Sequence, residues 1–221
     1  MQNAESKTLK EAEWLTKNII NDEINQKADL VLCDYVLNEI SFEKREKVLE
    51  KLYNSTNKIL VIIEPGTPEE FDEIKSIRDY FIKKKANIIA PCTHLQKCNV
   101  KDGDWCAFSV RVARTKIHKI LKDGSAPYED EKFSYIVISK NKMNIPTNRI
   151  LRHPKIESGK ITLKVCDAEE NKEIIITKKN KEQFKKAKKL NCGDCFEIWE
   201  YNYMHQNYIC TSSNNHFKIK Y

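Results

Sequence analysis

Short apolar runs alternate with longer amphipathic segments through the first two thirds of the chain. The runs at 29–34 and 59–63 have the length and the continuous apolar character of buried parallel strands. Amphipathic segments at 41–54 and 68–84 have helical spacing, and further strands are expected at 87–90 and 133–139. Strand, helix, strand, helix, strand is the order of a doubly wound sheet, so the sequence predicts an α/β fold.

Local signals mark where the helices begin. Ser41 is a favourable N-cap for the first of them, whose inner side is expected to include Phe42. Pro68 suits the first turn of the second, in which acidic residues come first and lysines last, the order that the helix dipole favours. A further helix is expected at 8–20, where apolar residues recur at helical spacing.

The pattern changes near Ile145 and Pro146, where we place a domain boundary. Residues 1–145 form a partial α/β domain with a cysteine-rich loop at 90–110, and residues 146–221 form a basic, β-rich domain. Short strands at 160–165, 173–177 and 195–201 and a helix at 181–190 are expected in the second domain. This pattern is compatible with a small barrel of the oligonucleotide-binding type.

Three cysteines, Cys92, Cys98 and Cys106, fall within fifteen residues. Clustered thiolates bind soft or borderline metals, and the polar residues between these cysteines argue against a buried apolar role. Their spacing matches neither ordinary zinc fingers nor the bacterial ferredoxin run, so zinc and an iron–sulfur cluster both stay open. His94 is interpreted as a surface residue or as a partner of the ligands rather than as a ligand.

Other cysteines receive weaker interpretations. Cys192 and Cys195 have Cys-x-x-Cys spacing and could form a rival zinc or redox site, but no thioredoxin-like context surrounds them, and a turn is favoured. Cys33 lies in an expected buried strand and Cys210 lies near the end of the sequence, so both are expected to be inert.

Positive charge is concentrated in the C-terminal third. Of the 39 Lys/Arg and 32 Asp/Glu, residues 1–139 hold 22 and 23, which leaves 17 and 9 for residues 140–221. Such asymmetry indicates a module that faces nucleic acid, although a lysine-rich surface from biased genome composition gives the same count. The candidate RNA contacts cluster on and near the helix at 181–190: Arg149, Arg152, Lys178, Lys179, Lys181, Lys185, Lys186, Lys188 and Lys189.

The sequence shows neither an apolar signal core nor an apolar run long enough to span a membrane. An Arg- and Ser-rich leader is also absent. We therefore expect a bacterial cytoplasmic protein without membrane contact, with the mitochondrial matrix as the alternative.

Four motifs resemble, in order and separation, the methyltransferase-like family associated with the mitochondrial small ribosomal subunit and its bacterial relatives. The motifs are Glu64-Pro65-Gly66-Thr67-Pro68, Ala90-Pro91-Cys92-Thr93-His94, Asp104-Trp105-Cys106-Ala107-Phe108-Ser109 and Tyr128-Glu129-Asp130-Glu131-Lys132-Phe133-Ser134-Tyr135. The resemblance extends over nearly the whole chain from about Ala28.

The resemblance implies a Rossmann-type methyltransferase fold with a cysteine-ligated [4Fe-4S] insertion. It implies a function in assembly of the small ribosomal subunit, through binding of rRNA and contact with ribosomal proteins. In that family a fourth cysteine comes from the C-terminal module, and the matching position here is Cys166. The resemblance therefore favours iron–sulfur over zinc and gives Cys92, Cys98, Cys106 and Cys166 as the metal ligands.

The chain departs from an active methyltransferase in its glycines. A glycine-rich turn lets the backbone approach S-adenosylmethionine, but the five glycines here are widely separated. The runs at 29–34 and 59–63 look like the fourth and fifth strands of the fold. The earlier strands are therefore expected to be missing, as in an N-terminally truncated member, or to come from a separately encoded N-terminal half. A catalytically degenerate assembly factor is the leading hypothesis. The alternatives are an active S-adenosylmethionine-dependent rRNA methyltransferase that needs that half, and a zinc-stabilised interaction module.

Overall fold

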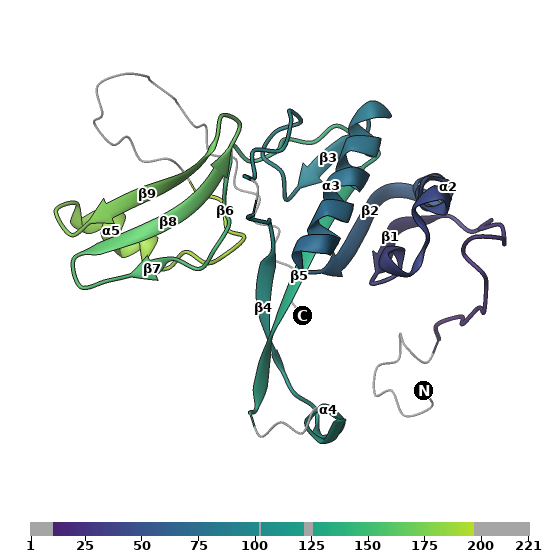
Figure 1. Cartoon of the computed structure of the whole chain (residues 1–221), viewed down its shortest axis with the longest axis horizontal. Helices are drawn as coiled ribbons and strands as arrows, with labels where there is room; N and C mark the ends of the chain where they lie inside the picture. Colours follow the sequence, from purple (N-terminus) through teal and green to yellow (C-terminus); the bar gives the residue numbers. More distant parts are fainter. Residues whose placement is uncertain (1–10, 102, 122–125, 197–221) are drawn as a thin grey trace.

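A computed structural model describes residues 11–101, 103–121 and 126–196 of the chain. In these ranges the protein has two sheets, each with its own hydrophobic core (Figure 1). The first sheet and its helices belong to residues up to Ser139, and the second sheet begins at Asn148. No helix in the described part of the chain is long and apolar enough to cross a membrane.

The first sheet is mixed, and its strand order is β1-β2-β5-β3, with β4 also paired to β5. Strands β1 (Ala28–Asp34) and β2 (Thr56–Pro65) are parallel and are joined by the 3₁₀-helix η1 (Leu37–Glu39) and helix α2 (Phe42–Asn54). Helix α3 (Pro68–Lys83) connects β2 to β3 (Asn87–Ala90). Strand β5 (Tyr128–Ser139) lies antiparallel between β2 and β3, so β1, β2 and β3 all run in one direction. This α/β architecture is consistent with a Rossmann-like fold, as predicted.

Helices α2 and α3 contribute to one core over the sheet. Val48 and Leu49 of α2 and Phe81 of α3 pack with Leu60 and other apolar residues of the strands. The expected signals at the start of α3 are present: Thr67 caps the helix by accepting from the Glu70 N–H (3.5 Å), and Pro68 is in the first turn.

For α2, the expected N-cap position of Ser41 is confirmed, and the expected burial of Phe42 is wrong. Ser41 is the N-cap of α2, but its side chain makes no capping hydrogen bond. Phe42 is 71 % exposed, because the first turn of α2 borders an open groove next to α3 rather than packing onto the sheet.

The expected helix at 8–20 is also not formed where the structure describes the chain, from residue 11 onward. Trp14 and Leu15 are mostly exposed, so a helix here would have no surface on which to bury its apolar face. The segment is instead held as irregular structure by Lys51, whose Nζ donates to the carbonyls of Ile20 (2.9 Å) and Asp22 (2.7 Å).

Strands β4 (Phe108–Ala113) and β5 form a long antiparallel hairpin that extends away from the rest of the molecule (Figure 1). Near its tip, helix α4 (Lys116–Leu121) carries three exposed apolar side chains, Ile117, Ile120 and Leu121. At the other end of the hairpin, β5 enters the first sheet between β2 and β3, so the hairpin and the sheet share one strand.

The second sheet is antiparallel and is built around β8 (Lys160–Asp167). Strands β6 (Asn148–Ile150) and β7 (Lys155–Ile156) pair with one edge of β8, and β9 (Asn171–Thr177) pairs with the other. Helix α5 (Lys181–Ala187) packs Phe184 and Ala187 against this sheet. The predicted helix is therefore confirmed, although it ends earlier than expected.

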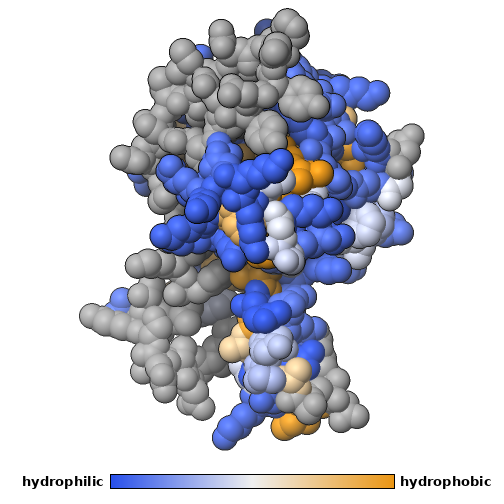
Figure 2. All heavy atoms as spheres, turned by 90° about the vertical axis from the view of Figure 1, so that its left-hand side faces the viewer, coloured by the Kyte–Doolittle hydropathy of each residue, from blue (hydrophilic) through white to orange (hydrophobic). Residues whose placement is uncertain are grey.

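A barrel of the oligonucleotide-binding type is not shown by the described residues, which form an open sheet with one helix. The predicted strand at 195–201 lies mostly outside them, and Cys195 and Phe196 are not in a strand. Figure 2 faces this second module, where hydrophilic side chains dominate the coloured surface.

Candidate metal centre

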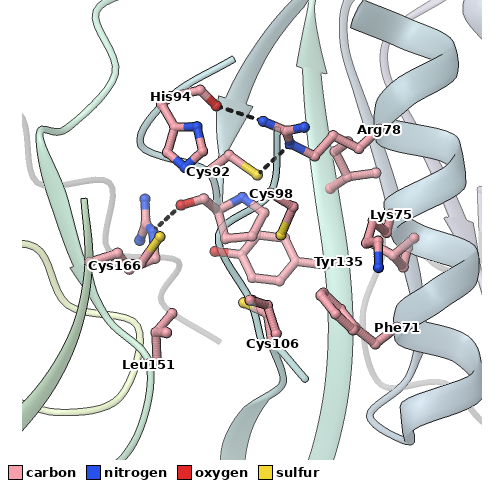
Figure 3. A pocket seen from close by; sticks show the side chains of 15 residues that line it. Phe71, Lys75, Arg78, Cys92, His94, Cys98, Cys106, Tyr135, Leu151 and Cys166 are labelled. Carbon is pink, nitrogen blue, oxygen red and sulfur yellow. Dashed lines mark hydrogen bonds between the residues drawn. The ribbon is translucent and has the colours of Figure 1, made fainter. Parts of the chain in front are cut away.

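Four cysteines line one cavity of about 50 Å³ between the two modules (Figure 3). Cys92 follows β3, Cys98 and Cys106 lie in the loop that leads to β4, and Cys166 comes from β8 of the second module. These are the four cysteines that the sequence and the family resemblance gave as ligands, and the structure brings all four together.

The alternation of β8 explains why Cys166 reaches this cavity. Ile161, Leu163 and Val165 point into the core of the second module, where each is fully buried. Because neighbouring strand residues point to opposite faces, Cys166 projects from the other face of the sheet. That face also carries Lys164, which is paired with Asp104 of the cysteine loop.

Arg78 of α3 holds the first part of the cysteine loop, a role that its position in the sequence did not suggest. Its side chain is 3 % exposed, and its Nε donates to the Cys92 sulfur (3.3 Å). Its Nη2 donates to the carbonyl of His94 (3.0 Å; Figure 3) and to the carbonyl of Gln96 (2.5 Å). A buried guanidinium that satisfies three acceptors in one loop fixes that loop against the helix.

Two arginines that were predicted to contact RNA join the modules to each other. Arg149 of β6 donates to the carbonyls of Pro91 (2.5 Å) and Gly193 (2.6 Å). Arg152 donates to the Trp105 carbonyl (2.6 Å) and pairs with Asp104 (3.0 Å). Both guanidinium groups are thus engaged inside the protein, and these contacts give them a role in holding the cysteine loop.

The loop is also bound to the end of β2. The Trp105 indole donates to the Gly66 carbonyl (3.0 Å), and the Ser134 hydroxyl of β5 donates to the Cys106 carbonyl (3.0 Å). Gly66 itself donates to the Lys132 carbonyl (3.0 Å). Residues of three of the four family motifs therefore contact one another in space.

Burial controls the protonation of the thiols in this structure. It raises the pKa of Cys166 to about 11, and it raises the pKa of Cys106 well above its ordinary value. Burial also raises the pKa of Cys92, although the nearby Arg78 charge opposes this effect. Without a bound cation these thiols are neutral at pH 7, so a metal would have to displace their protons.

His94 is buried rather than on the surface, and it lines the same cavity. Burial lowers its pKa, so the ring is neutral, and its Nε2 lies 3.4 Å from the Asn99 amide. Within the described ranges, no group of three or more His, Cys, Asp or Glu side chains has the arrangement that would hold a single metal ion.

The other cysteines that the structure describes do not line this cavity. Cys192 and Cys195 flank a turn in which Gly193 has φ +88° and donates to the Ile150 carbonyl (2.8 Å). Cys33 is buried in the first core, and Cys210 lies outside the described residues.

The lysines predicted to contact RNA are exposed. They lie on α5, on the turn before it and on the residues that follow it, with Phe184 and Ala187 turned inward. The seven are Lys178, Lys179, Lys181, Lys185, Lys186, Lys188 and Lys189.

Comparison with known proteins gives one family. A search of curated proteins finds no match. The family model described as mitochondrial small ribosomal subunit Rsm22 matches residues 2–197, which is most of the chain. The protein therefore belongs to the Rsm22 family of the mitochondrial small ribosomal subunit.

Proposed function

We propose that this protein is an assembly factor of the small ribosomal subunit that binds rRNA and carries a structural [4Fe-4S] cluster. The cluster would be held by Cys92, Cys98, Cys106 and Cys166. One observation carries the proposal: four cysteines from two modules line one cavity. Family membership supports the part that concerns the small ribosomal subunit.

The donor set fits a cluster better than a zinc ion. Around one zinc ion, four sulfurs lie about 3.8 Å apart, given Zn–S bonds of about 2.3 Å. The described residues contain no such close group, yet four cysteines surround a single cavity. Its volume of about 50 Å³ is several times the roughly 10–15 Å³ that one water needs. A group larger than one ion is therefore favoured, and thiolates are the usual ligands of [4Fe-4S] clusters.

Such a cluster would supply folding free energy to the joint between the modules. Three ligands belong to the loop that follows β3, and the fourth belongs to β8. The ligand set does not exist in the unfolded chain, so the free energy of binding adds to the free energy of folding. The contacts of Arg149, Arg152 and Lys164 with the loop would position the ligands before the cluster binds.

Anaerobic purification followed by iron, sulfide and zinc analysis tests this proposal. We expect about four irons and four sulfides per chain and a brown protein. Cys166→Ser should lose most of the iron, while Cys195→Ser, the matched control outside the cavity, should keep it. One zinc per chain without visible absorption would refute the cluster and favour the zinc-stabilised module. Iron lost in Cys195→Ser but kept in Cys166→Ser would refute the ligand set.

The exposed lysines around α5 support rRNA binding. A lysine that contacts a phosphate releases counterions, so removing one such lysine lowers the log–log slope of affinity against salt by roughly 0.7–0.9. Replacing Lys178, Lys179, Lys185 and Lys188 by Gln should lower the slope by about 3 with small-subunit rRNA. Replacing Lys44 and Lys47, which are exposed on α2, is the control and should change it little. An equal change of slope per lysine in the two sets would assign binding to overall charge.

The unpaired edge and exposed face of strand β1 support the proposal that a partner supplies the rest of the sheet. Among the described residues β1 pairs only with β2, and Leu30 and Leu32 on its uncovered face are 61 % and 58 % exposed. Parallel sheets normally have both faces covered. We propose that a separately encoded N-terminal half covers this face. An active methyltransferase formed with that half is the second candidate function.

Cofactor titration separates the two candidates. The sequence has no glycine-rich turn for S-adenosylmethionine, so isothermal titration of the full chain should show no binding. Binding of S-adenosylmethionine by this chain alone would overturn its assignment as a catalytically degenerate assembly factor. For localisation, the family description fits the mitochondrial alternative, while the bacterial cytoplasm stays a prediction.

A further inference from the structure

An acidic groove lies on a different face of α3 from the one that holds the cysteine loop. It is a cavity of about 370 Å³, open to solvent, between the first turns of α3, the helix η1 and the start of α2. Four carboxylates and one arginine are among its lining residues, which are Asn38, Phe42, Arg45, Glu69, Glu70, Asp72, Glu73 and Ser76. In a chain with a net charge of +7, this surface has the opposite sign.

The acidic residues alone do not indicate a ligand. Glu69 and Glu70 are in the first turn of α3, where the helix dipole already favours negative charge. Asp72 pairs with Lys75 (3.4 Å) on the same helix. Two other residues of the groove point to a ligand.

Glu73 and Asn38 each present an acceptor that has no partner. The Glu73 side chain is only 8 % exposed; one of its oxygens pairs with Arg45 (3.2 Å), while Oε1 is buried without a hydrogen bond in the described part of the protein. Asn38 Oδ1 is also buried without a hydrogen bond in the described part of the protein, and both residues line the groove. A buried acceptor without a donor destabilises the fold, so native proteins rarely leave two at one place.

The donor that these acceptors lack does not come from Arg45. Its Nε donates to the carbonyls of Ile40 (2.7 Å) and Leu37 (3.2 Å), and its Nη2 is paired with the other oxygen of Glu73. A single metal ion is not indicated either, since the described residues contain no suitable group of ligands. Because four carboxylates line the groove and no metal ion is indicated among the described residues, the ligand that complements it is an organic cation.

Phe42 narrows the class of cation. It lines the groove and is 71 % exposed, so one face of its ring is available next to the carboxylates. A guanidinium can stack on an aromatic ring while its N–H groups reach several acceptors in one plane. An ammonium has no planar face and fewer donors.

We propose that the groove binds an arginine side chain from a basic segment of a protein partner. The guanidinium would stack on Phe42 and donate to Glu73 Oε1 and Asn38 Oδ1. RNA is disfavoured as the occupant, because its phosphates would meet the carboxylates of Glu69, Glu70 and Asp72.

Fluorescence anisotropy with a labelled peptide that carries two adjacent arginines tests this site on the full chain. The same peptide with citrulline, and one with lysine, are the ligand controls. Phe42→Ala should weaken arginine-peptide binding about tenfold, the effect expected when a partly desolvated cation–π contact is removed. Glu73→Gln should weaken it at least as much.

Glu46→Gln is the matched control, because it removes one carboxylate from the exposed surface of α2 outside the groove. It should bind the arginine peptide like the unmodified chain. Equal binding of the citrulline peptide, or an equal loss in Glu46→Gln and Glu73→Gln, would overturn the proposal. Displacement of the peptide by single-stranded RNA, with RNA binding lost in Phe42→Ala, would assign the groove to RNA instead. Because Phe42 is exposed, its variant keeps the test valid if Glu73→Gln folds poorly.

Discussion

Replacing Gly66 by alanine should break the connection between the first sheet and the cysteine loop. A Cβ at this position would lie 2.7 Å from the Phe133 backbone nitrogen and 2.8 Å from the Lys132 carbonyl carbon. Both are backbone atoms of β5, so no side chain can rotate away to relieve the contact. The neighbouring pair, Pro65 with Phe133, is the last of the β2–β5 register, and it would have to separate.

Separation of the strands would weaken two hydrogen bonds, from Gly66 N–H to the Lys132 carbonyl (3.0 Å) and from the Trp105 indole to the Gly66 carbonyl (3.0 Å). Each of them contributes about 0.5–1.5 kcal/mol. Overpacking adds about 1–3 kcal/mol. We therefore expect Gly66→Ala to lower the free energy of unfolding by about 4 kcal/mol, which corresponds to a fall in Tm of about 8–16 °C for a chain of this size.

Gly159→Ala is the matched control, since a Cβ there meets nothing within 4 Å and the φ of Gly159 is outside the left-handed region. It should leave stability unchanged or raise it by about 0.4–1 kcal/mol. Urea unfolding of both variants gives the comparison, with iron content as a second measurement. Equal stability of the two alanine variants would refute the argument from close approach. Lower stability with full iron content would refute the link to the cysteine loop.

Buried and exposed side chains give three further predictions. Arg78→Met should lower the free energy of unfolding by about 2–4 kcal/mol and reduce iron retention, because buried carbonyls lose their donor; unchanged iron content would contradict its role in holding the loop. Burial raises the pKa of Glu64 to about 7, so its contribution to stability is full below about pH 4.5, the ordinary pKa, and is lost as pH rises through about 7. Glu64→Gln should flatten this decline of the unfolding free energy, measured by urea unfolding between about pH 5 and 8. A steeper decline in the variant would contradict the direction of the pKa shift. Leu32→Ala should cost less than about 1 kcal/mol in the full chain alone, whereas Leu60→Ala, which is fully buried, should cost about 2–5 kcal/mol; similar costs would show that the β1 face is already covered.

Periodicity predicted the parts of the fold in which local sequence and burial agree. Strands β1, β2, β3 and β8 and helix α3 were expected near their observed bounds, because their apolar residues repeat with one period and their ends carry matching signals. The segment at 8–20 has the same helical period, yet from residue 11 onward it is not helical. Ile19 and Ile20 pack against the first core, but Trp14 and Leu15 are mostly exposed, and periodicity does not report whether a surface exists for the whole helical face.

The candidate metal centre was only partly predictable from the sequence, because a local pattern does not show which distant residues pack together. Cys92, Cys98 and Cys106 are close in sequence, so their spacing alone suggested a site. Cys166 lies much further along the chain, and only the family resemblance named it. Arg78 gave no signal, because a single arginine in an amphipathic helix normally faces solvent, and only the packing of the loop against α3 shows that it is buried.

The arginines also show why total charge misleads at a joint between modules. Arg149 and Arg152 belong to the basic C-terminal third, and composition alone placed them with the lysines around α5. In the structure they donate to backbone carbonyls of the cysteine loop and of the turn at Gly193, a task for which the planar guanidinium is better suited than an ammonium. The lysines stay exposed on and around α5. The basic excess therefore has two physical roles: Arg149, Arg152 and Lys164 hold the modules together, and the lysines on and around α5 lie exposed where phosphates can reach them. An Arg149→Lys change should accordingly lower the iron content of the purified chain more than it changes the salt dependence of RNA binding.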